Sequence, residues 1–451
     1  MKRLGAAAAL LGVAACSRPV PTEAWLRAAL ARGSGHIRLP TGAIEISSEI
    51  AVRNAHDLTV EGDGGVLRAA PGFRGRALLS FQSATGVRLR NFSVDGNRAA
   101  LETRQGLPPS DVPFARFTPN NGLLIERSSE VEISGVAFSE IAGFAILVNA
   151  SRGVRIGWVR VTDSGSRNAA GRNNTTGGIL LEEGTTDFEV RDSELARIRG
   201  NGVWTHSLYT SPRNGPGRIA DNRFEEIGRD AVQVGHATRV VVEGNTGRRI
   251  GFPTSEVDIE GRAYPVGIDT AGNVDASVYR HNCFEDLNGK CIDLDGFHHG
   301  QVLANVCVNR RPPEEYPFGN YGIVMNNTNP DMQSEEITIA DNEIDGPQFG
   351  GIFVIGAGHQ VLRNRLRNVN RAHCNEDAAR FGCYHAPGEP DMLRSGIYLG
   401  RGAERPAPAR GNRIEDNQIS GYEMDRRCIA AAPGVRLDDN IITRNRCEVT
   451  P

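Results

Sequence analysis

The sequence contains little helical periodicity, and it is poor in methionine and lysine. Only 5 of the 451 residues are methionine, and few stretches carry apolar side chains at helical spacing. Lysine is nearly absent, since Lys2 and Lys290 are the only two and arginine supplies the other basic side chains. The length would suffice for two or three ordinary domains, but 53 glycines and so little helical pattern indicate a chain of short strands and turns.

An excess of positive charge is also missing. With 51 Lys and Arg against 54 Asp and Glu, the formal net charge is −3, and loss of the two basic residues of a leader would make it −5. A mildly acidic surface offers no electrostatic basis for nucleic-acid binding, so we expect no nucleic-acid partner. We expect the chain to act as a monomer.

No apolar run near the N-terminus is long enough to cross a bilayer as a stable helix. Two basic residues precede the apolar run from Leu4 to Ala15, and residues 1–16 therefore predict a secretory signal peptide. The end of this segment, "VAAC", resembles a bacterial lipobox, which predicts lipid on Cys16 and a membrane contact through that lipid alone. The expected location is the periplasm or the cell surface; the alternative is a plain signal peptide cleaved near Ala15 and a secreted protein.

Zinc-type cysteine spacing is absent. Seven cysteines follow Cys16, and six of the seven could pair in an oxidising compartment. We predict one bridge across a loop and one at the C-terminal end: Cys374–Cys383 and Cys428–Cys447. The other three lie on neighbouring repeats, and at most two of them can pair: Cys283, Cys291 and Cys307.

What the sequence does contain is a repeat. Short segments open with a small and an apolar residue, as in "GIDTAG" at 267, "CIDLDG" at 291 and "GIVMNN" at 322. Between them runs the pattern apolar-x-x-Asn, which places asparagine at 222, 245, 282, 305, 342, 364, 417 and 440. The minimum repeat is near 22 or 23 residues, and insertions lengthen some repeats. Short alternating strands with glycine and asparagine at the corners predict a parallel β-helix; the leucine consensus of a horseshoe solenoid is absent.

The sequence resembles the right-handed parallel β-helix proteins of the pectin-lyase-like superfamily. The resemblance rests on the repeats and on "WLRAALARGSGHIRLPTGAIEIS" from Trp25 and "LRNFSVDGN" ending at Asn97. It implies an all-β solenoid of about 12 coils whose open end is capped by a short helix, with Trp25, Leu26, Ala29 and Leu30 as its apolar face. We expect residues 17–100 to form the cap and first coils, 101–121 a loop insertion, and 122–451 the repeats.

Strand alternation predicts which side chains leave the coil. With Ile268, Ile292 and Leu294 inside, the neighbouring positions point outward. One outward row is Trp204, Gln233, Asp269, Asp293, Val324, Phe353 and Tyr398. A second is His206, Gly235, Ala271, Asp295, Asn326, Ile355 and Gly400.

These rows bring an acidic cluster together. Asp269 and Asp293 are expected one rung apart, about 4.8 Å, with Asp295 about 6.5–7 Å along the strand. Carboxylates this close need a cation, a shared proton or a nearby base, and Lys290 lies on the same strand. We predict catalytic roles for Asp293, Asp295, Lys290 and His298, and a Ca²⁺ site at Asp269, Asp293 and Asp295. The expected substrate-binding residues are Trp204, His206, Gln233, Asn326, Phe353 and Tyr398.

Two chemistries fit the cluster, and both act on a polysaccharide, expected to be acidic. In a lyase, Ca²⁺ would pair with a uronate while Lys290 or a histidine removes the C5 proton; a C5-epimerase would use the same groups. In an inverting hydrolase, Asp293 and Asp295 would serve as the carboxyl pair. The polygalacturonase-type hydrolases of this fold carry Asn-Thr-Asp, Asp-Asp and Gly-His-Gly, and "GIDTAG" with "DLDGFHHG" departs from that pattern.

A non-catalytic reading remains open: a surface-anchored glycan-binding or structural protein. Outer faces of solenoids are polar by default, and aspartates beside glycine corners often cap turns. The loops at 101–121 and 370–394 favour a substrate site over a bare stalk. If Asp293 is exposed, Asp293→Asn should leave folding intact and abolish activity.

Overall fold

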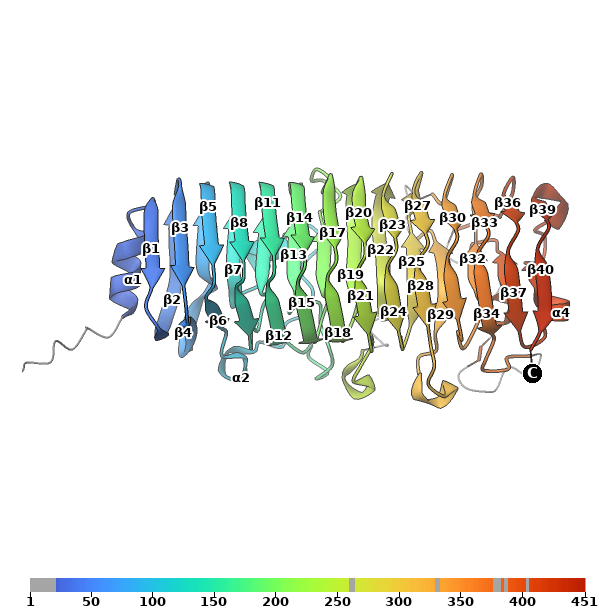
Figure 1. The fold of residues 1–451 in the computed structure, drawn as a ribbon, viewed down its shortest axis with the longest axis horizontal. Coiled ribbons are helices and arrows are strands. Elements are labelled where there is room, and N and C mark those ends of the chain that lie inside the picture. Colours follow the sequence, from blue (N-terminus) through green and yellow to red (C-terminus); the bar gives the residue numbers. More distant parts are fainter. Residues whose placement is uncertain are drawn as a thin grey trace, which may run out of the picture.

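The computed structural model describes residues 22–258, 264–328, 333–375, 383–384, 388–402 and 405–450. The predicted leader, including Cys16, lies outside these residues. Figure 1 shows a single elongated stack of coils, which runs from β1 at the N-terminal end to β39 and β40 at the C-terminal end. The chain is an all-β, right-handed parallel β-helix, as predicted.

Three ladders of parallel strands run along the stack. Sheet 1 has 14 strands, so the stack is longer than the 12 or so coils expected. Its strands are β1 (Gly35–Leu39), β3 (Leu58–Gly62), β5 (Thr85–Arg90), β8 (Ser129–Ser134), β11 (Arg152–Gly157), β14 (Thr186–Arg191), β17 (Gly217–Ala220), β20 (Val240–Glu243), β23 (Val278–Arg280), β27 (Gln301–Leu303), β30 (Thr338–Ala340), β33 (Gln360–Leu362), β36 (Arg413–Glu415) and β39 (Ile441–Thr443).

Sheet 2 carries the opening motifs of the repeats and therefore the predicted site. Its strands are β2 (Gly42–Arg53), β4 (Gly65–Gln82), β7 (Asn121–Glu126), β10 (Ile146–Asn149), β13 (Ile179–Glu182), β16 (Val203–His206), β19 (Val232–Thr238), β22 (Val266–Asp275), β25 (Lys290–Asp295), β29 (Tyr321–Asn326), β32 (Ile352–Val354), β35 (Ile397–Leu399) and β38 (Ile429–Ala431). The short strand β26 (Phe297–His298) pairs with the end of β22.

Sheet 3 completes each coil and is joined to sheet 2 through the long strand β4. Its strands are β6 (Ser93–Asp95), β9 (Ala137–Ser139), β12 (Arg160–Ser164), β15 (Glu194–Ile198), β18 (Arg223–Ile227), β21 (Thr246–Arg248), β24 (Cys283–Glu285), β28 (Val306–Val308), β31 (Glu343–Asp345), β34 (Arg365–Val369), β37 (Gln418–Gly421) and β40 (Arg446–Val449).

Helices are short and lie at the ends and in the loops. The α-helices are α1 (Glu23–Leu30), α2 (Arg98–Leu101), α3 (Phe114–Phe117) and α4 (Met424–Arg427). The 3₁₀ turns are Thr254–Glu256, Pro313–Glu315, Met392–Arg394 and Leu437–Asp439. At the N-terminal end of the stack, α1 buries Leu26, Ala29 and Leu30, whereas Trp25 stays exposed. Within the described residues, none of the helices is long and apolar enough to cross a membrane.

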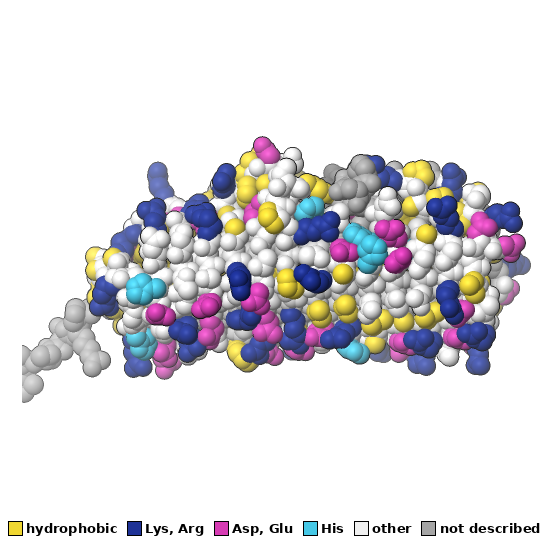
Figure 2. All heavy atoms as spheres, turned by 90° about the horizontal axis from the view of Figure 1, so that it is seen from above, with side chains coloured by type: hydrophobic (Ala, Val, Ile, Leu, Met, Phe, Trp, Pro, Cys, Tyr) yellow, Lys and Arg dark blue, Asp and Glu magenta, His cyan; other side chains and the backbone are white. Residues whose placement is uncertain are grey.

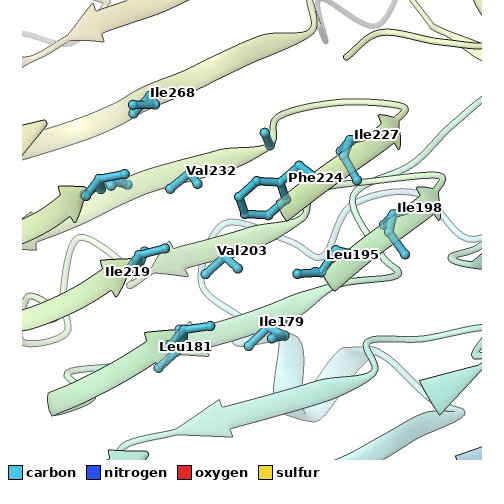
Figure 3. Packing of buried hydrophobic residues seen from close by; sticks show 14 of the residues in the cluster. Ile179, Leu181, Leu195, Ile198, Val203, Ile219, Phe224, Ile227, Val232 and Ile268 are labelled. Carbon is cyan, nitrogen blue, oxygen red and sulfur yellow. The ribbon is translucent and has the colours of Figure 1, made fainter. Parts of the chain in front are cut away.

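The core is one continuous column of stacked apolar side chains. Figure 3 shows Ile179, Val203, Val232 and Ile268 from successive strands of sheet 2, facing Leu195 and Phe224 from sheet 3. All of them are buried. Burial of each such side chain is worth about 1.5–3 kcal/mol relative to exposure, and it is available only when a neighbouring coil covers it.

An asparagine ladder marks one corner of the coils. Each side-chain amide donates to the Oδ1 of the next asparagine at 2.9–3.0 Å, along Asn222, Asn245, Asn282, Asn305, Asn342, Asn364, Asn417 and Asn445. The prediction that Asn440 is the last member of this ladder is wrong. Asn440 belongs to another corner, where Asn412 donates to it at 3.0 Å. The last spacing is therefore 28 residues.

The described residues contain three disulfides. The predicted pairs Cys374–Cys383 and Cys428–Cys447 are confirmed, and a third joins Cys291 to Cys307. Among the described residues, Cys283 is the free cysteine. Disulfides of this number are typical of an oxidising compartment.

Candidate functional site

The predicted register of the first outward row is confirmed in sheet 2. The paired positions are Trp204 with Gln233, Gln233 with Asp269, Asp269 with Asp293, Asp293 with Val324, Val324 with Phe353, and Phe353 with Tyr398. In the second row, Asp295 pairs with Asn326. The coil stack therefore does place Asp269 and Asp293 on adjacent rungs, about 4.8 Å apart along the axis.

The expectation of an open groove is wrong for most of this row, because loops cover it. Some of the inserted loops connect a strand of sheet 3 to the next strand of sheet 2. Others follow a strand of sheet 2, at the opposite corner of the coil. Figure 1 shows loops and short helices that project beyond one edge of the stack. As whole residues, Asp293 is therefore 7% exposed, and Trp204, Phe353 and Tyr398 are 6%, 2% and 0% exposed.

The insertion at 101–121 closes the N-terminal half of the row. Its helix α3 is held by Glu182, whose carboxylate accepts the amides of Phe114 and Ala115 at 2.9 and 2.8 Å. Phe114 then packs edge-on against Trp204, with ring centroids 4.9 Å apart, and against His206 at 5.4 Å. Trp204 belongs to this second apolar cluster and does not offer an open face to a sugar.

Phe353 and Tyr398 are likewise occupied with each other. Their rings stack with centroids 5.9 Å apart and an interplanar angle of 20°. Both belong to the buried apolar cluster, and burial raises the pKa of Tyr398. The prediction that their faces are open to a sugar is not met, because both residues are buried.

A hollow of ≈ 240 Å³ remains between the insertion and the corner after β16. Its walls are mostly apolar, and its polar groups include those of Arg229, Gln233 and His206. The other lining residues include Leu107, Pro108, Pro109, Leu208 and Tyr209. Gln233 also faces Asp269, so the hollow adjoins the acidic cluster.

Asp269 lies at the end of a chain of amides. Asn201 donates to Gln233 at 2.6 Å, and Gln233 in turn donates to Oδ2 of Asp269 at 2.7 Å. Burial, reinforced by the charges of Asp230 and Asp293, raises the pKa of Asp269 well above its ordinary value. Its environment therefore disfavours the charged form of Asp269.

Asp293 is the ion-paired member of the cluster. The Lys290 ammonium donates to its Oδ2, and Asn326 donates to its Oδ1 at 2.9 Å. Burial alone would lower the pKa of Lys290, but the charge and hydrogen bond of Asp293 outweigh burial and raise it. Lys290 is thus a protonated counter-ion, which argues against the predicted role of a base.

Asp295 is held by one residue of the next coil. Thr328 donates its backbone amide to Oδ1 at 2.9 Å and its hydroxyl to Oδ2 at 2.6 Å. Burial raises the pKa of Asp295 to about 6; the Asp293 charge adds to this shift and Thr328 opposes it. Asp295 can therefore exchange a proton near neutral pH.

Asp230 completes the cluster and was missed in the sequence. It is 1% exposed, its Oδ1 has no hydrogen-bond partner, and burial raises its pKa to about 7, against the opposing charge of Arg229. Its charge also acts on Asp269. The sequence contained one indication of its position. Asp230 lies two residues before the inward Val232, just as Lys290 lies two residues before the equivalent Ile292.

The histidines lie outside this cluster. His298 Nε2 is 3.5 Å from Asp275 Oδ1, and His299 Nδ1 is 2.9 Å from the same oxygen. No hydrogen bond or ion pair within the described part of the chain joins either of them to Asp293 or Asp295. His206 sits beneath the insertion, where burial lowers its pKa to about 4.

Two exposed tyrosines border the cluster and were also missed. Tyr264 is 48% exposed and Tyr384 is 54% exposed. Tyr384 lies close enough to Lys290 for the two groups to shift each other's pKa, and Tyr264 acts on Tyr384. Both come from long loops between sheets 3 and 2, where strand periodicity gives no information about position.

The three aspartates fit a Ca²⁺ ion poorly. Ca²⁺ takes about 6–8 oxygen ligands, but here an ammonium already neutralises Asp293 and Thr328 occupies both oxygens of Asp295. In the described ranges, two groups place three ligand atoms within 4.8 Å of one another, Asp275/His298/His299 and Glu182/Glu183/His206, and neither is this one. The sequence predicted a metal ion as the positive charge beside these carboxylates, and Lys290 provides a positive charge there.

Comparisons with known proteins support the fold. No family model matches the chain, and no curated protein matches it either. A surface adhesin of Streptococcus pneumoniae, PfbA, is 14% identical with a TM-score of 0.57, over 76% of this chain and 85% of its own. The Dettilon tailspike protein is 13% identical with a TM-score of 0.54, over 92% of this chain; the chain spans 66% of the tailspike.

A third solved structure is an enzyme. DFA-IIIase from Arthrobacter chlorophenolicus A6, without its lid and in complex with GF2, is 11% identical with a TM-score of 0.50, over 91% of this chain and 88% of its own. At such low identity these similarities bear on architecture alone. They agree with the register, the ladders and the core in identifying the chain as a right-handed parallel β-helix.

Proposed function

We propose that this protein is an exported glycoside hydrolase whose catalytic pair is Asp293 and Asp295. The observation that carries the proposal is the contrast between two neighbouring carboxyl groups. Asp293 is paired with the Lys290 ammonium, whereas burial raises the pKa of Asp295 to about 6. Opposite environments for two adjacent carboxyls are what acid and base roles require.

In this mechanism Asp295 is the acid and Asp293 the base. Asp295 gives its proton to the glycosidic oxygen, so that the bond from that oxygen to the anomeric carbon can break. Asp293 takes a proton from water, and the resulting hydroxide equivalent bonds to the anomeric carbon. The two residues lie at i and i+2 on β25, so their spacing of about 6.5–7 Å suits inversion, for which about 6.5–9.5 Å is typical.

The lyase alternative is weaker because Lys290, one of its predicted bases, is held as an ammonium by Asp293. Lys290 would have to be neutral to remove a C5 proton, but Asp293 raises its pKa. A Ca²⁺ ion would have to displace this ammonium from Asp293. The test below therefore includes Ca²⁺ as a variable.

Substrate binding is assigned to two regions beside the acids. Tyr264 and Tyr384 offer exposed rings near Lys290, and the hollow beside Gln233 offers apolar walls with a few polar groups. Of the residues predicted from the sequence, Gln233, His206 and Asn326 remain in this proposal. An acidic glycan would need a cation, and both Lys290 and Arg229 already face carboxylates.

Location and anchoring complete the proposal. Three disulfides fit an exported protein, and Cys16 is the proposed lipid attachment site, with the secreted form as the alternative. The similarity to PfbA, a surface adhesin, agrees with an exported β-helix.

The test is an activity screen of the chain from Ser17 onward on acidic and neutral polysaccharides, with and without Ca²⁺. Reducing ends and ultraviolet absorbance of unsaturated products are read in parallel. We expect reducing ends alone, lowered about 10²–10⁴-fold in Asp293→Asn. The matched control is Asp341→Asn, whose carboxylate pairs with Arg363 on the surface and should leave the rate unchanged.

Absorbance rising together with reducing ends would mean a lyase and would overturn the assignment. Silence on every substrate would favour the non-catalytic reading, which a glycan-binding array would then examine. Equal rates in Asp293→Asn and Asp341→Asn would place the chemistry elsewhere.

A further inference from the structure

A second group of ligand atoms lies outside the aspartate cluster, on the surface of three consecutive coils. Asp275 ends β22, His298 and His299 follow on the next coil, and Glu335 comes from the loop before β30. Asp275 and His298 are register partners, so their side chains leave the stack on the same side. Figure 2 shows histidine side chains bordered by acidic ones near the middle of one long face.

The donor atoms converge on a single point. Asp275 Oδ1 is 2.9 Å from His299 Nδ1 and 3.5 Å from His298 Nε2, and one ligand atom from each residue lies within 4.8 Å of the others. Ligands bound tetrahedrally at about 2.0–2.2 Å lie about 3.3–3.6 Å from one another. The Asp275–His298 distance falls in this range, the Asp275–His299 distance is shorter because these two atoms are hydrogen-bonded, and the two imidazole nitrogens lie within 4.8 Å of each other.

The second nitrogen of His298 has a hydrogen-bond acceptor, and the second nitrogen of His299 has a carboxylate nearby. His298 Nδ1 lies 3.1 Å from the carbonyl oxygen of Gly296, and a hydrogen bond there places the proton on Nδ1. The Nε2 lone pair then faces Asp275 Oδ1, an arrangement that a cation between them would make favourable. His299 Nε2 lies 3.8 Å from Glu335 Oε1. Metal-bound histidines usually donate their other N–H to a carbonyl or carboxylate in this way.

The backbone holds this arrangement in place. The amide of His299 donates to the carbonyl oxygen of Glu335 at 3.0 Å, which fixes the loop beside the imidazole. The side chain of His298 is 14% exposed, whereas His299 is 45% exposed. One side of the group is thus built into the coil and the other faces solvent.

We propose that Asp275, His298 and His299 form a binding site for a divalent transition metal of the Zn²⁺ class, with at least one coordination position open to solvent. Two imidazoles and one carboxylate favour such an ion over Ca²⁺ or Mg²⁺, which prefer oxygen ligands. The site would link two coils and lies three residues beyond Asp295. It accounts for His298 without a role in the hydrolytic step.

The experiment is calorimetric titration of Zn²⁺ into the chelator-treated, desalted chain from Ser17 onward. We expect one equivalent to bind, and binding to be lost in His298→Ala and in Asp275→Asn. His281→Ala is the matched control, because His281 is an exposed corner histidine of the adjacent coil and should leave binding unchanged. Co²⁺ in place of Zn²⁺ should give the visible absorption of a four-coordinate site in the wild type and in His281→Ala only.

Absence of stoichiometric Zn²⁺ binding would overturn the proposal. So would binding that survives His298→Ala but is lost in His206→Ala, because it would place the metal at Glu182, Glu183 and His206. Thermal unfolding of each metal-free variant verifies that lost binding does not reflect lost folding. If His298→Ala unfolds early, His299→Asn provides the second variant, since asparagine tolerates the left-handed backbone at this position.

Discussion

At the scale of single residues, the cluster depends on its one lysine. Four aspartates lie close together: Asp230, Asp269, Asp293 and Asp295. Burial and the charge of Asp293 raise the pKa of the other three. Lys290 neutralises Asp293 directly. Asp230, Asp269 and Asp295 have no such partner in this cluster, and burial raises their pKa. The acid and base roles proposed for Asp295 and Asp293 follow from this unequal treatment of similar groups.

Removal of the Asp293 charge should therefore destabilise the fold, contrary to the expectation from an exposed residue. Asp293→Asn leaves the Lys290 ammonium, 26% exposed, without its partner. We expect a loss of about 2 kcal/mol in the free energy of unfolding, measured by urea denaturation. Lys290→Met combined with Asp293→Asn should lose less than Asp293→Asn alone, because no charge is then left unpaired.

The surface variant Asp341→Asn is the control and should change stability by about 0.5 kcal/mol or less. If Asp293→Asn proved no more costly than this control, the ion pair would not carry the stability we assign to it.

At the scale of elements, the insertion at 101–121 is what turns an outer face into an interior. Glu182 binds the first amides of α3 and Asn149 donates to the same carboxylate at 2.9 Å. The ring of Phe114 then packs edge-on against the rings of Trp204 and His206. The insertion thereby shapes one wall of the hollow beside Gln233 and limits where a glycan can lie.

Glu182 should give the docked insertion a pH dependence. Burial raises the pKa of Glu182 from 4.5 to about 7, so the folded chain holds a proton that the unfolded chain has lost between these values. This contribution is fully present below pH 4.5 and is lost as the pH rises through 7. Between pH 5 and pH 8 we expect the free energy of unfolding to fall by about 3 kcal/mol on account of this residue.

Glu182→Gln isolates that contribution, because it removes the titration and keeps the shape. The difference in unfolding free energy between the wild type and Glu182→Gln should shrink with rising pH. His206, with its pKa lowered to about 4, acts in the opposite direction below pH 6.5 but is present in both proteins. A difference that stays constant from pH 5 to pH 8 would contradict the assignment.

At the scale of the whole molecule, a solenoid makes some features easy to predict and others hard. The repeat of small, apolar and asparagine residues fixed the fold and the register from Trp204 to Tyr398, because strand alternation and stacking act locally. What covers each coil depends on insertions without periodicity. For that reason the burial of Trp204, Phe353 and Asp293, and the positions of Tyr264 and Tyr384, could not be predicted from the sequence.

The same distinction applies to the site. The sequence indicated the clustering of Asp269, Asp293, Asp295 and Lys290, since their positions follow from register alone. The protonation of Lys290 and the pairing of His298 with Asp275 depend on side-chain geometry at corners. The position of Asp230 was not predicted because this residue precedes strand β19, and the inward and outward alternation applies only within the strand.

The most direct measurement of the central claim is the pH dependence of hydrolysis in the wild type and in Asp295→Asn. With Asp295 as the acid, the wild-type kcat should fall about tenfold per pH unit above about 6, because the protonated fraction of a group with this pKa falls at that rate. Asp295→Asn should lose this descending limb and most activity on the polysaccharide. On an aryl glycoside of the same sugar, whose leaving group needs no proton, Asp295→Asn should recover and Asp293→Asn should not. A wild-type pH profile in Asp295→Asn, or recovery of Asp293→Asn instead, would contradict the account.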